Sequence, residues 1–305
     1  MTKKTKYLIV LNIILIAAIS FSLKKNTSSS TLNRVDTQFA LSDSSVVHRI
    51  VLGEQTFVKQ ENATWRINER YQVDERRMRS LLALLQRVSI KRPASEAIKA
   101  QVQQEIRQSG FPVQTFDVNG QELQRFRFIA KDGETYAAHE EANPYIIHVP
   151  GVSLNLANWF TANETSWRNR QVIQTTWRTL KNMDVSYKND PSNSFQITFA
   201  DNFYNVPGIS QLDSAAVYDY LLRIQEFKVS RFIADRPNLA DSLALLQPLC
   251  SIGVQDLYSE RDNTLSIYPT NETLYGVLEK GKEVVEISPR ALESIMVPKA
   301  AFEKK

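Results

Sequence analysis

The 305-residue chain is poor in the residues that most often carry chemistry, with one cysteine, three histidines and nine glycines. A single cysteine, Cys250, excludes an internal disulfide, so stability has to come from packed cores. We expect Cys250 to be a buried core thiol. The sparse glycines form neither a phosphate-cradling loop nor a dinucleotide fingerprint. We therefore expect no cofactor.

The three histidines do not match a catalytic or metal-binding pattern. A hydrolytic triad needs a histidine beside a nucleophile, but His48 and His148 lie in strand-like segments and no Gly-x-Ser-x-Gly elbow is present. His139-Glu140-Glu141 together with His148 has a spacing that matches no established metal site. The 33 acidic residues contain no pair that stands out as a glycosidase pair. We expect structural histidines, no metal and no enzymatic activity.

The charge balance is basic only at the N-terminus. The whole chain has 37 Lys and Arg against 33 Asp and Glu, with a sequence pI of about 9.0. Five of the lysines lie at or before Lys25, and without them 32 basic residues (37 minus 5) face 33 acidic ones. A near-neutral remainder lacks the basic footprint of a nucleic-acid-binding protein. We expect no nucleic-acid partner.

Tyr7 to Leu23 is an apolar run interrupted only by Asn12, Ser20 and Ser22. As a helix it would span ~26 Å at ~1.5 Å per residue, close to the thickness of a bilayer core. We interpret it as an uncleaved, single-pass membrane anchor. A cleaved secretory signal stays an alternative, because Ser20 and Ser22 supply small residues for a cleavage site. A soluble core helix is the third alternative.

Lysines flank this run on both sides. Lys3, Lys4 and Lys6 precede it, and the positive-inside rule then places the short N-terminus in the cytoplasm and the bulk of the chain outside it; Lys24 and Lys25 weaken that bias. A polar segment rich in Ser and Thr follows and is typical of a flexible tether. The expected location is the inner (cytoplasmic) membrane, with a periplasmic or extracytoplasmic ectodomain.

One pattern occurs twice in that ectodomain. Asp74 and Asp213 each follow an apolar residue and precede a helical apolar pattern, as helix N-caps do. Adding 139 (213 minus 74) carries the apolar positions of the first helix onto those of the second: Met78, Leu81, Leu82 and Leu85 onto Val217, Tyr220, Leu221 and Ile224. Similar strand–helix units arise by chance, but this ungapped match favours a duplication.

The segments around the two helices repeat in the same order. Trp65 and Ile67 match Tyr204 and Val206, and an apolar helix follows a proline in each half, with Leu154 and Leu156 against Leu292 and Ile295. We expect a second helix over 94–108 and its counterpart over 239–246, and a hairpin turn at Asn119-Gly120. The expected class is α+β, with two tandem antiparallel sheets and helices packed on one face of each.

The predicted organisation has four parts: a cytoplasmic tail and anchor (1–25), a tether (26–36), a first repeat (37–165) and a second repeat (166–305). Aromatic and arginine side chains gather near the junction of the repeats: Trp159, Phe160, Trp167, Arg168, Arg170, Trp177 and Arg178. One interpretation is packing, with arginine stems lying on aromatic rings. The other is a partner-binding surface, for which we select Trp159, Trp167, Arg168 and Arg170, because Trp and Arg are typical interface anchors.

Several phrases resemble the domain-of-unknown-function 4340 family of bacterial membrane-anchored envelope proteins. They are Phe39 to Asp43, Trp65 to Asn68, Tyr71 to Asp74 with its helix, and Tyr145 to Gly151, so the similarity covers nearly the whole ectodomain. Members are often encoded beside gliding-type ABC transporter subunits, which implies an auxiliary role in a transport or envelope complex. The family also tends to carry an arginine patch between its halves, which Trp167 to Arg170 resembles. No catalytic residue is established for it.

We therefore expect a non-enzymatic envelope protein that binds other proteins, in particular subunits of an ABC-type transport or gliding-related complex. The alternative is an envelope hydrolase or glycan-binding module. That alternative requires a concave pocket with convergent polar groups.

The membrane orientation can be tested with C-terminal reporter fusions. We expect alkaline phosphatase fused after the last residue to be active, and a fluorescent protein that folds only in the cytoplasm to be dark, because the positive-inside rule places the C-terminus outside. A bright fluorescent fusion with an inactive phosphatase would contradict the predicted orientation.

Overall fold

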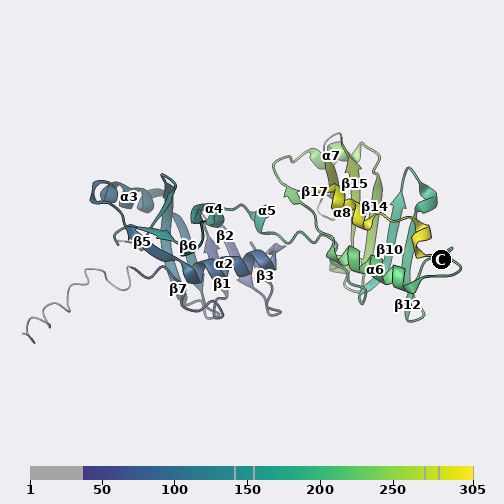
Figure 1. The fold of residues 1–305 in the computed structure, drawn as a ribbon, viewed down its shortest axis with the longest axis horizontal. Coiled ribbons are helices and arrows are strands. Elements are labelled where there is room, and N and C mark those ends of the chain that lie inside the picture. Colours follow the sequence, from purple (N-terminus) through teal and green to yellow (C-terminus); the bar gives the residue numbers. More distant parts are fainter. Residues whose placement is uncertain (1–36, 141, 154, 271–272, 281, 305) are drawn as a thin grey trace, which may run out of the picture. The chain divides into compact units, whose positions relative to one another are not determined.

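The computed structural model describes residues 37–140, 142–153, 155–270, 273–280 and 282–304. These residues form two antiparallel sheets with helices packed on them, which confirms the α+β class (Figure 1). The predicted anchor and tether lie outside the described residues. Within the described ranges, no helix has the length and apolar character needed to cross a membrane.

The first sheet has nine strands in the described part of the chain, in the order β4-β3-β2-β1-β6-β7-β8-β9-β5. They are β1 (Arg49–Leu52), β2 (Gln55–Lys59), β3 (Trp65–Ile67), β4 (Tyr71–Gln72), β5 (Ser89–Pro93), β6 (Phe111–Phe116), β7 (Glu122–Lys131), β8 (Glu134–Ala138) and β9 (Tyr145–His148). The helices of this part of the chain are α2 (Glu75–Arg87), α3 (Glu96–Ser109), α4 (Leu156–Phe160) and α5 (Glu164–Trp167).

The second sheet has eight strands among the described residues, in the order β12-β11-β10-β14-β15-β16-β17-β13. They are β10 (Leu180–Tyr187), β11 (Phe195–Ala200), β12 (Phe203–Asn205), β13 (Arg231–Ile233), β14 (Cys250–Asp256), β15 (Asn263–Pro269), β16 (Leu274–Leu278) and β17 (Glu283–Ile287). The helices are α6 (Ser214–Glu226), α7 (Leu239–Ala244) and α8 (Pro289–Ile295), with 3₁₀ turns η1 (Pro191–Asn193), η2 (Ser259–Arg261) and η3 (Lys299–Phe302).

The two sheets share one strand order. Without the two-residue strand β4, the first sheet reads β3-β2-β1-β6-β7-β8-β9-β5, and each of these strands has a counterpart at the same place in the second sheet. By packing, the chain divides into two compact units: one runs up to Thr56 and includes Ser80–Thr161, and the other combines Phe57–Arg79 with the chain from Ala162 onward.

Both predicted N-caps are confirmed. The Asp213 carboxylate accepts hydrogen bonds from the amides of Ala215 and Ala216, and the Asp74 carboxylate accepts one from the amide of Arg77. These bonds satisfy amides that have no partner inside the helix. Of the four positions predicted to face the core on the first of these helices, Met78, Leu81 and Leu85 are buried and Leu82 is half-buried.

The backbone of each N-cap is also held by a residue far along the chain. The Asp74 amide donates to the carbonyl of Trp167, and the Asp213 amide donates to the carbonyl of Phe302, each at 2.8 Å. One residue further on, Arg168 and Glu303 form isolated bridges with Val73 and Leu212. Both Trp167 and Phe302 are buried. In each repeat, the start of the helix is therefore hydrogen-bonded to a short segment that begins with a buried aromatic residue. We call this segment the closing segment.

Helices pack on both faces of each sheet, so the expectation of helices on one face is wrong. In the second sheet, Val285 and Ile287 join a core with α6 and α8, whereas Val284, which precedes Val285 and faces the other way, packs with Leu243 of α7. In the first, the ring of Phe128 contacts Phe160 of α4. Residues of β8 and β9 that face the other way form a separate core with α3, made of Ala94, Val102, Ile106, Tyr136, Ala138 and Ile146. The sequence misses this because α3 and α7 cover only a part of their sheet face.

The sequence pattern also predicts neither β5 nor β13, the strands at corresponding edges of the two sheets. Both are short, and β5 contains a register shift between Ile90 and Arg92. Pro93 is the last residue of β5. Because β5 is an edge strand, the backbone N–H that proline lacks is not needed to pair with a further strand on its outer side. Edge strands of this kind lack the alternation that identifies buried strands.

A pair of glycines in the second sheet offers a matched test of core packing. A Cβ atom at Gly276 would lie 2.7 Å from Leu265, 2.8 Å from Val285 and 2.9 Å from Ile287, whereas at Gly253 the nearest atom is 3.7 Å away. We expect Gly276→Ala to destabilise the protein by about 1–3 kcal/mol through overpacking. Gly253→Ala should be neutral or slightly stabilising. Thermal unfolding of the two variants and the wild type measures this, and equal midpoints for both variants would contradict it.

Candidate functional site

Trp167 belongs to the core, not to the surface. Its side chain has 0% exposure, packs edge-on against Phe57 at 5.2 Å between ring centroids, and receives the Arg77 guanidinium at 4.5 Å from its ring. Its indole N–H donates to the carbonyl of Ala162. For Trp167 the packing interpretation therefore describes the structure, since a fully buried ring offers no docking surface.

Arg168 is held between two aromatic rings. Its guanidinium carbon lies 3.6 Å from the ring centroid of Tyr71 and 3.6 Å from that of Phe232. Both terminal nitrogens donate to the Glu283 carboxylate at 2.8 Å, and the Arg168 side chain is 9% exposed. A flat guanidinium suits this arrangement, because it stacks on rings while its edge pairs with a carboxylate. We call this group the arginine clamp.

The other predicted partner-binding residues lie elsewhere. Trp159 is on α4 in the first unit and is half-buried, and Arg170 is exposed in the second unit, where it donates to the carbonyl of Ser230 at 3.3 Å. Partner binding by these residues stays a prediction. Nothing local to Arg168 in the sequence points to Phe232 or Glu283, because they lie on strands 64 and 115 residues away (232 and 283 minus 168).

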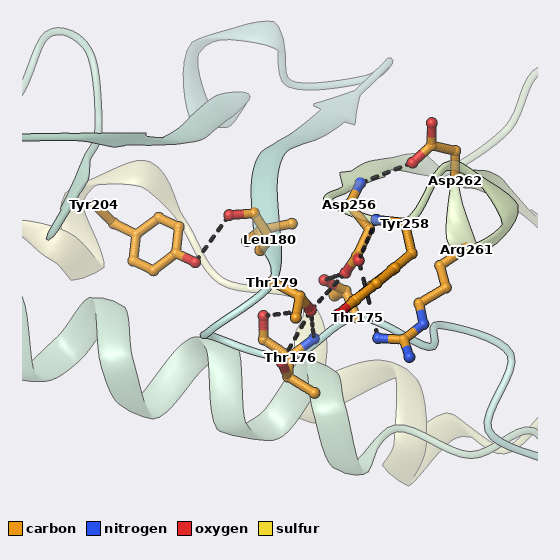
Figure 2. Close-up of polar contacts among 9 residues, drawn as sticks. All are labelled: Thr175, Thr176, Thr179, Leu180, Tyr204, Asp256, Tyr258, Arg261 and Asp262. Atoms are coloured by element: carbon orange, nitrogen blue, oxygen red, sulfur yellow. Dashed lines mark hydrogen bonds and ion pairs between the residues drawn. The ribbon is translucent and has the colours of Figure 1, made fainter. Parts of the chain in front are cut away.

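A second fixed point is the buried carboxylate of Asp256, at the end of β14. Figure 2 shows the hydroxyls of Thr175 and Thr179 pointing at it, and both donate to it at 2.7 Å. The Tyr258 amide donates to the other oxygen at 3.0 Å, and Arg261 lies 3.9 Å away. The Asp256 amide in turn donates to the Asp262 carboxylate. The network therefore fixes the turn around η2.

The electrostatics of Asp256 follow from these contacts. Burial by itself raises the pKa of this carboxyl, but the donors Thr175, Tyr258 and Thr179, and the charge of Arg261, outweigh burial and lower the pKa below its usual value. The carboxylate therefore stays ionised and fully engaged. Its contacts hold the turn around η2 in place.

Between the arginine clamp and η2 lies an open hollow of about 840 Å³. Tyr71, Arg168, Phe232 and Glu283 line it on the clamp side, and Glu260 to Asn263 line it on the η2 side. Most of the remaining lining is polar, with amide side chains such as Gln72 and Gln174. The hollow is thus bounded by two groups of side chains whose positions are set by strong internal contacts.

The described residues include no group of three or more His, Cys, Asp or Glu that could hold a metal ion. The histidine assignments agree with a structural role: His148 ends β9, His48 directly precedes β1, and His139 stacks on Phe39 with ring centroids 4.6 Å apart. Cys250 is buried as expected, and burial raises the pKa of its thiol to about 12. Such a thiol is a poor nucleophile.

An exposed aromatic group on the second sheet was not predicted as a unit. The Tyr204 ring contacts Phe199 at 5.4 Å and Phe203 at 5.7 Å, and its hydroxyl donates to the carbonyl of Trp177. The Trp177 ring in turn packs against Tyr218 at 5.6 Å. Phe199 is 53% exposed and Tyr218 is 37% exposed. We call Trp177, Phe199, Phe203 and Tyr218 the aromatic patch.

The patch could have been identified in the sequence by comparing the two repeats. Phe199 pairs with Tyr204 as Lys59 pairs with Trp65, and the constant offset of 139 places Tyr218 on Arg79. The first repeat thus has charged residues where the second has exposed aromatic ones. Where exposed positions are charged in one repeat and aromatic in the other, the aromatic surface indicates a function that the other repeat does not share.

Comparisons with known proteins give one match. A family model described as a domain of unknown function (DUF4340) matches residues 35–247. No curated protein and no solved structure matches the chain.

The Asp256 network predicts a stability change that depends on pH. We expect Asp256→Asn to destabilise the protein by about 1–3 kcal/mol, because an amide cannot accept all the hydrogen bonds that the carboxylate accepts. The wild-type carboxyl has a folded-state pKa below the unfolded value of roughly 3.9, so its stabilisation is complete above that pH and is lost as the pH falls below it.

Thermal unfolding between pH 7 and pH 3 measures both effects. Between these pH values, the unfolding midpoint of the variant should fall less than that of the wild type. Asp219→Asn is the control, since it removes the carboxylate of an exposed residue on α6, outside the Asp256 network. A variant of Asp256 that unfolds with the wild type at neutral pH would show that the network is dispensable.

Proposed function

The chain belongs to the DUF4340 family, and from this premise we propose that it is a non-enzymatic envelope protein that binds subunits of an ABC-type transport or gliding-related complex. The observation that carries the proposal is the aromatic patch. Clusters of exposed aromatic side chains are rare on the surfaces of globular proteins. Where they occur, binding to a protein partner is a common reason. Trp and Tyr are also the residues that most often dominate binding energy at interfaces.

The patch has the anatomy of an interface centre. Phe199 and Tyr218 are exposed, while the buried Tyr204, whose ring packs against Phe199, is fixed by hydrogen bonds to the carbonyls of Trp177 and Leu180. Rings that are already ordered lose little conformational entropy on binding. Arg178 lies against Trp177 at 4.9 Å from its ring and adds a charge at the rim. The surface is therefore ready to bind without rearrangement.

A gene duplication explains why only one repeat carries this surface. The duplication is supported by the shared strand order, by the offset of 139 between the capped helices, and by the matching closing segments of Trp167 and Phe302. After duplication the two copies can diverge, and here the first has charged residues where the second has exposed aromatic ones. The proposal thus assigns docking to the second repeat.

The membrane anchor completes the proposal. A helix over 7–23, with the short N-terminus in the cytoplasm, would hold the ectodomain next to a transporter in the inner membrane. Membrane attachment increases the effective concentration of a weak partner, so a modest patch suffices for a stable assembly. An envelope hydrolase, the alternative class, requires a reactive pair. The buried carboxylate of Asp256, beside η2, already accepts hydrogen bonds from Thr175 and Thr179, which help to lower its pKa.

The docking surface can be tested by cross-linking mass spectrometry in native membranes. Phe199→Ser combined with Tyr218→Ser should reduce the recovery of cross-links to an ABC ATPase and its permease by about tenfold, the equivalent of ~1.4 kcal/mol, because the variant removes two interface anchors. The two side chains are exposed, so the fold should persist, which thermal unfolding would verify.

Leu245→Ser is the matched control, since Leu245 is 89% exposed and outside the patch. A parallel variant, Trp159→Ser with Arg170→Glu, tests the residues selected from the sequence. Loss in the parallel variant alone would move the docking surface away from the patch. Unchanged cross-links in all variants, or wild-type cross-links to neither subunit, would refute the proposal.

A further inference from the structure

The hollow between the arginine clamp and η2 is a built cavity with its own chemistry. Its volume of about 840 Å³ lies within the roughly 300–1,000 Å³ range of small-molecule sites. The side chains on its two sides are fixed by the stacked, bidentate Arg168 and by the Asp256 network. Positioned polar groups around a hollow of this size are what ligand recognition requires.

The formal charges of the side chains that line the hollow nearly cancel. Five cationic side chains and four anionic ones line it. Arg168 is neutralised by Glu283, and the ammonium of Lys280 donates to the carbonyl of Glu260. Sites for phosphates and other polyanions instead present a clear excess of unpaired cations. The balance therefore favours a ligand without net charge.

The remaining lining is dominated by side-chain amides. Seven of the lining residues are Asn or Gln: Gln60, Asn62, Gln72, Asn169, Gln171, Gln174 and Asn263. An amide both donates and accepts hydrogen bonds, as a sugar hydroxyl does, whereas an apolar ligand would leave these groups without partners. Within the described chain, the amides of Gln72 and Gln174 make no side-chain hydrogen bond, so their bonding capacity is open to a ligand.

We propose that this hollow binds a neutral oligosaccharide, held by hydrogen bonds from Gln72, Gln174 and their neighbours. An extended peptide is the other uncharged, polar ligand to consider. Peptides are commonly bound by pairing with a strand edge. The edge of β4 is already paired with the closing segment, since the Asn169 amide donates to the carbonyl of Gln72. The geometry thus favours the saccharide.

Binding can be measured with the full-length protein in phospholipid nanodiscs, which avoids detergents with sugar headgroups. The probes are chitotetraose, maltotetraose and the uncharged polar tetrapeptide Gly-Ser-Asn-Gly with blocked ends. We expect at least one tetrasaccharide to bind saturably with a Kd below about 1 mM in calorimetry, and to receive saturation transfer from the protein in NMR.

Gln72→Ala combined with Gln174→Ala should weaken that binding by roughly tenfold, because two amide partners are lost while no internal hydrogen bond is. Gln108→Ala, an exposed glutamine on α3, is the matched control and should bind as the wild type does. Binding of the peptide alone, no saccharide binding up to about 10 mM, or equal affinity in the double variant and the control would overturn the proposal. Each of these outcomes leaves docking at the aromatic patch unaffected, since the two sites share no residue.

Discussion

The hydrogen bond between the amide of an N-cap aspartate and the carbonyl of a buried aromatic residue is the constraint on which the rest of this protein depends. It occurs as Asp74 with Trp167 and as Asp213 with Phe302. In each case the partners are about ninety residues apart (167 minus 74 is 93, and 302 minus 213 is 89). A contact over that distance orders a long stretch of chain, and the buried ring supplies the apolar area that offsets the lost entropy.

The closing segment also creates the candidate site. The chain leaves the buried Trp167 and continues into Arg168, whose guanidinium then enters the space between Tyr71 and Phe232 and pairs with Glu283. Burying an arginine costs free energy unless a partner of opposite charge compensates for the lost water. The bidentate carboxylate of Glu283 is that partner. In the second repeat the corresponding position is Glu303, and a carboxylate cannot form a clamp of this kind, because it neither stacks on rings as a cation nor pairs with another carboxylate.

Polar and aromatic surfaces occupy two different places in the second compact unit. The hollow is neutral, amide-rich and positioned by internal pairs, whereas the aromatic patch is apolar and exposed. A polar hollow discriminates ligands by leaving hydrogen-bonding groups unpaired when the wrong molecule enters, and an aromatic surface gains affinity by releasing water. The two proposed ligands, a polyol and a protein, therefore match two surfaces of different chemistry.

Periodic and local features were predictable from the sequence because their causes are local. The N-caps at Asp74 and Asp213, the buried thiol of Cys250 and the hairpin at Asn119-Gly120 each follow from a few neighbouring residues, and all are observed; Gly120 has the positive φ of 80° that such a turn requires. The family assignment, too, was accessible at this level, because soft apolar patterns repeated over a whole domain carry information together.

The sequence by itself therefore determined the α+β class, the repeated capped helix and the family. Only the tertiary structure decided that helices cover both faces of each sheet, that Trp167 lies in a core, and that Arg168 meets Phe232 and Glu283. The physical reason is distance along the chain. Helix caps and hairpin turns gain their energy from residues that are close in sequence, whereas a stacked arginine and a buried ring gain theirs from residues that only the completed sheets bring together.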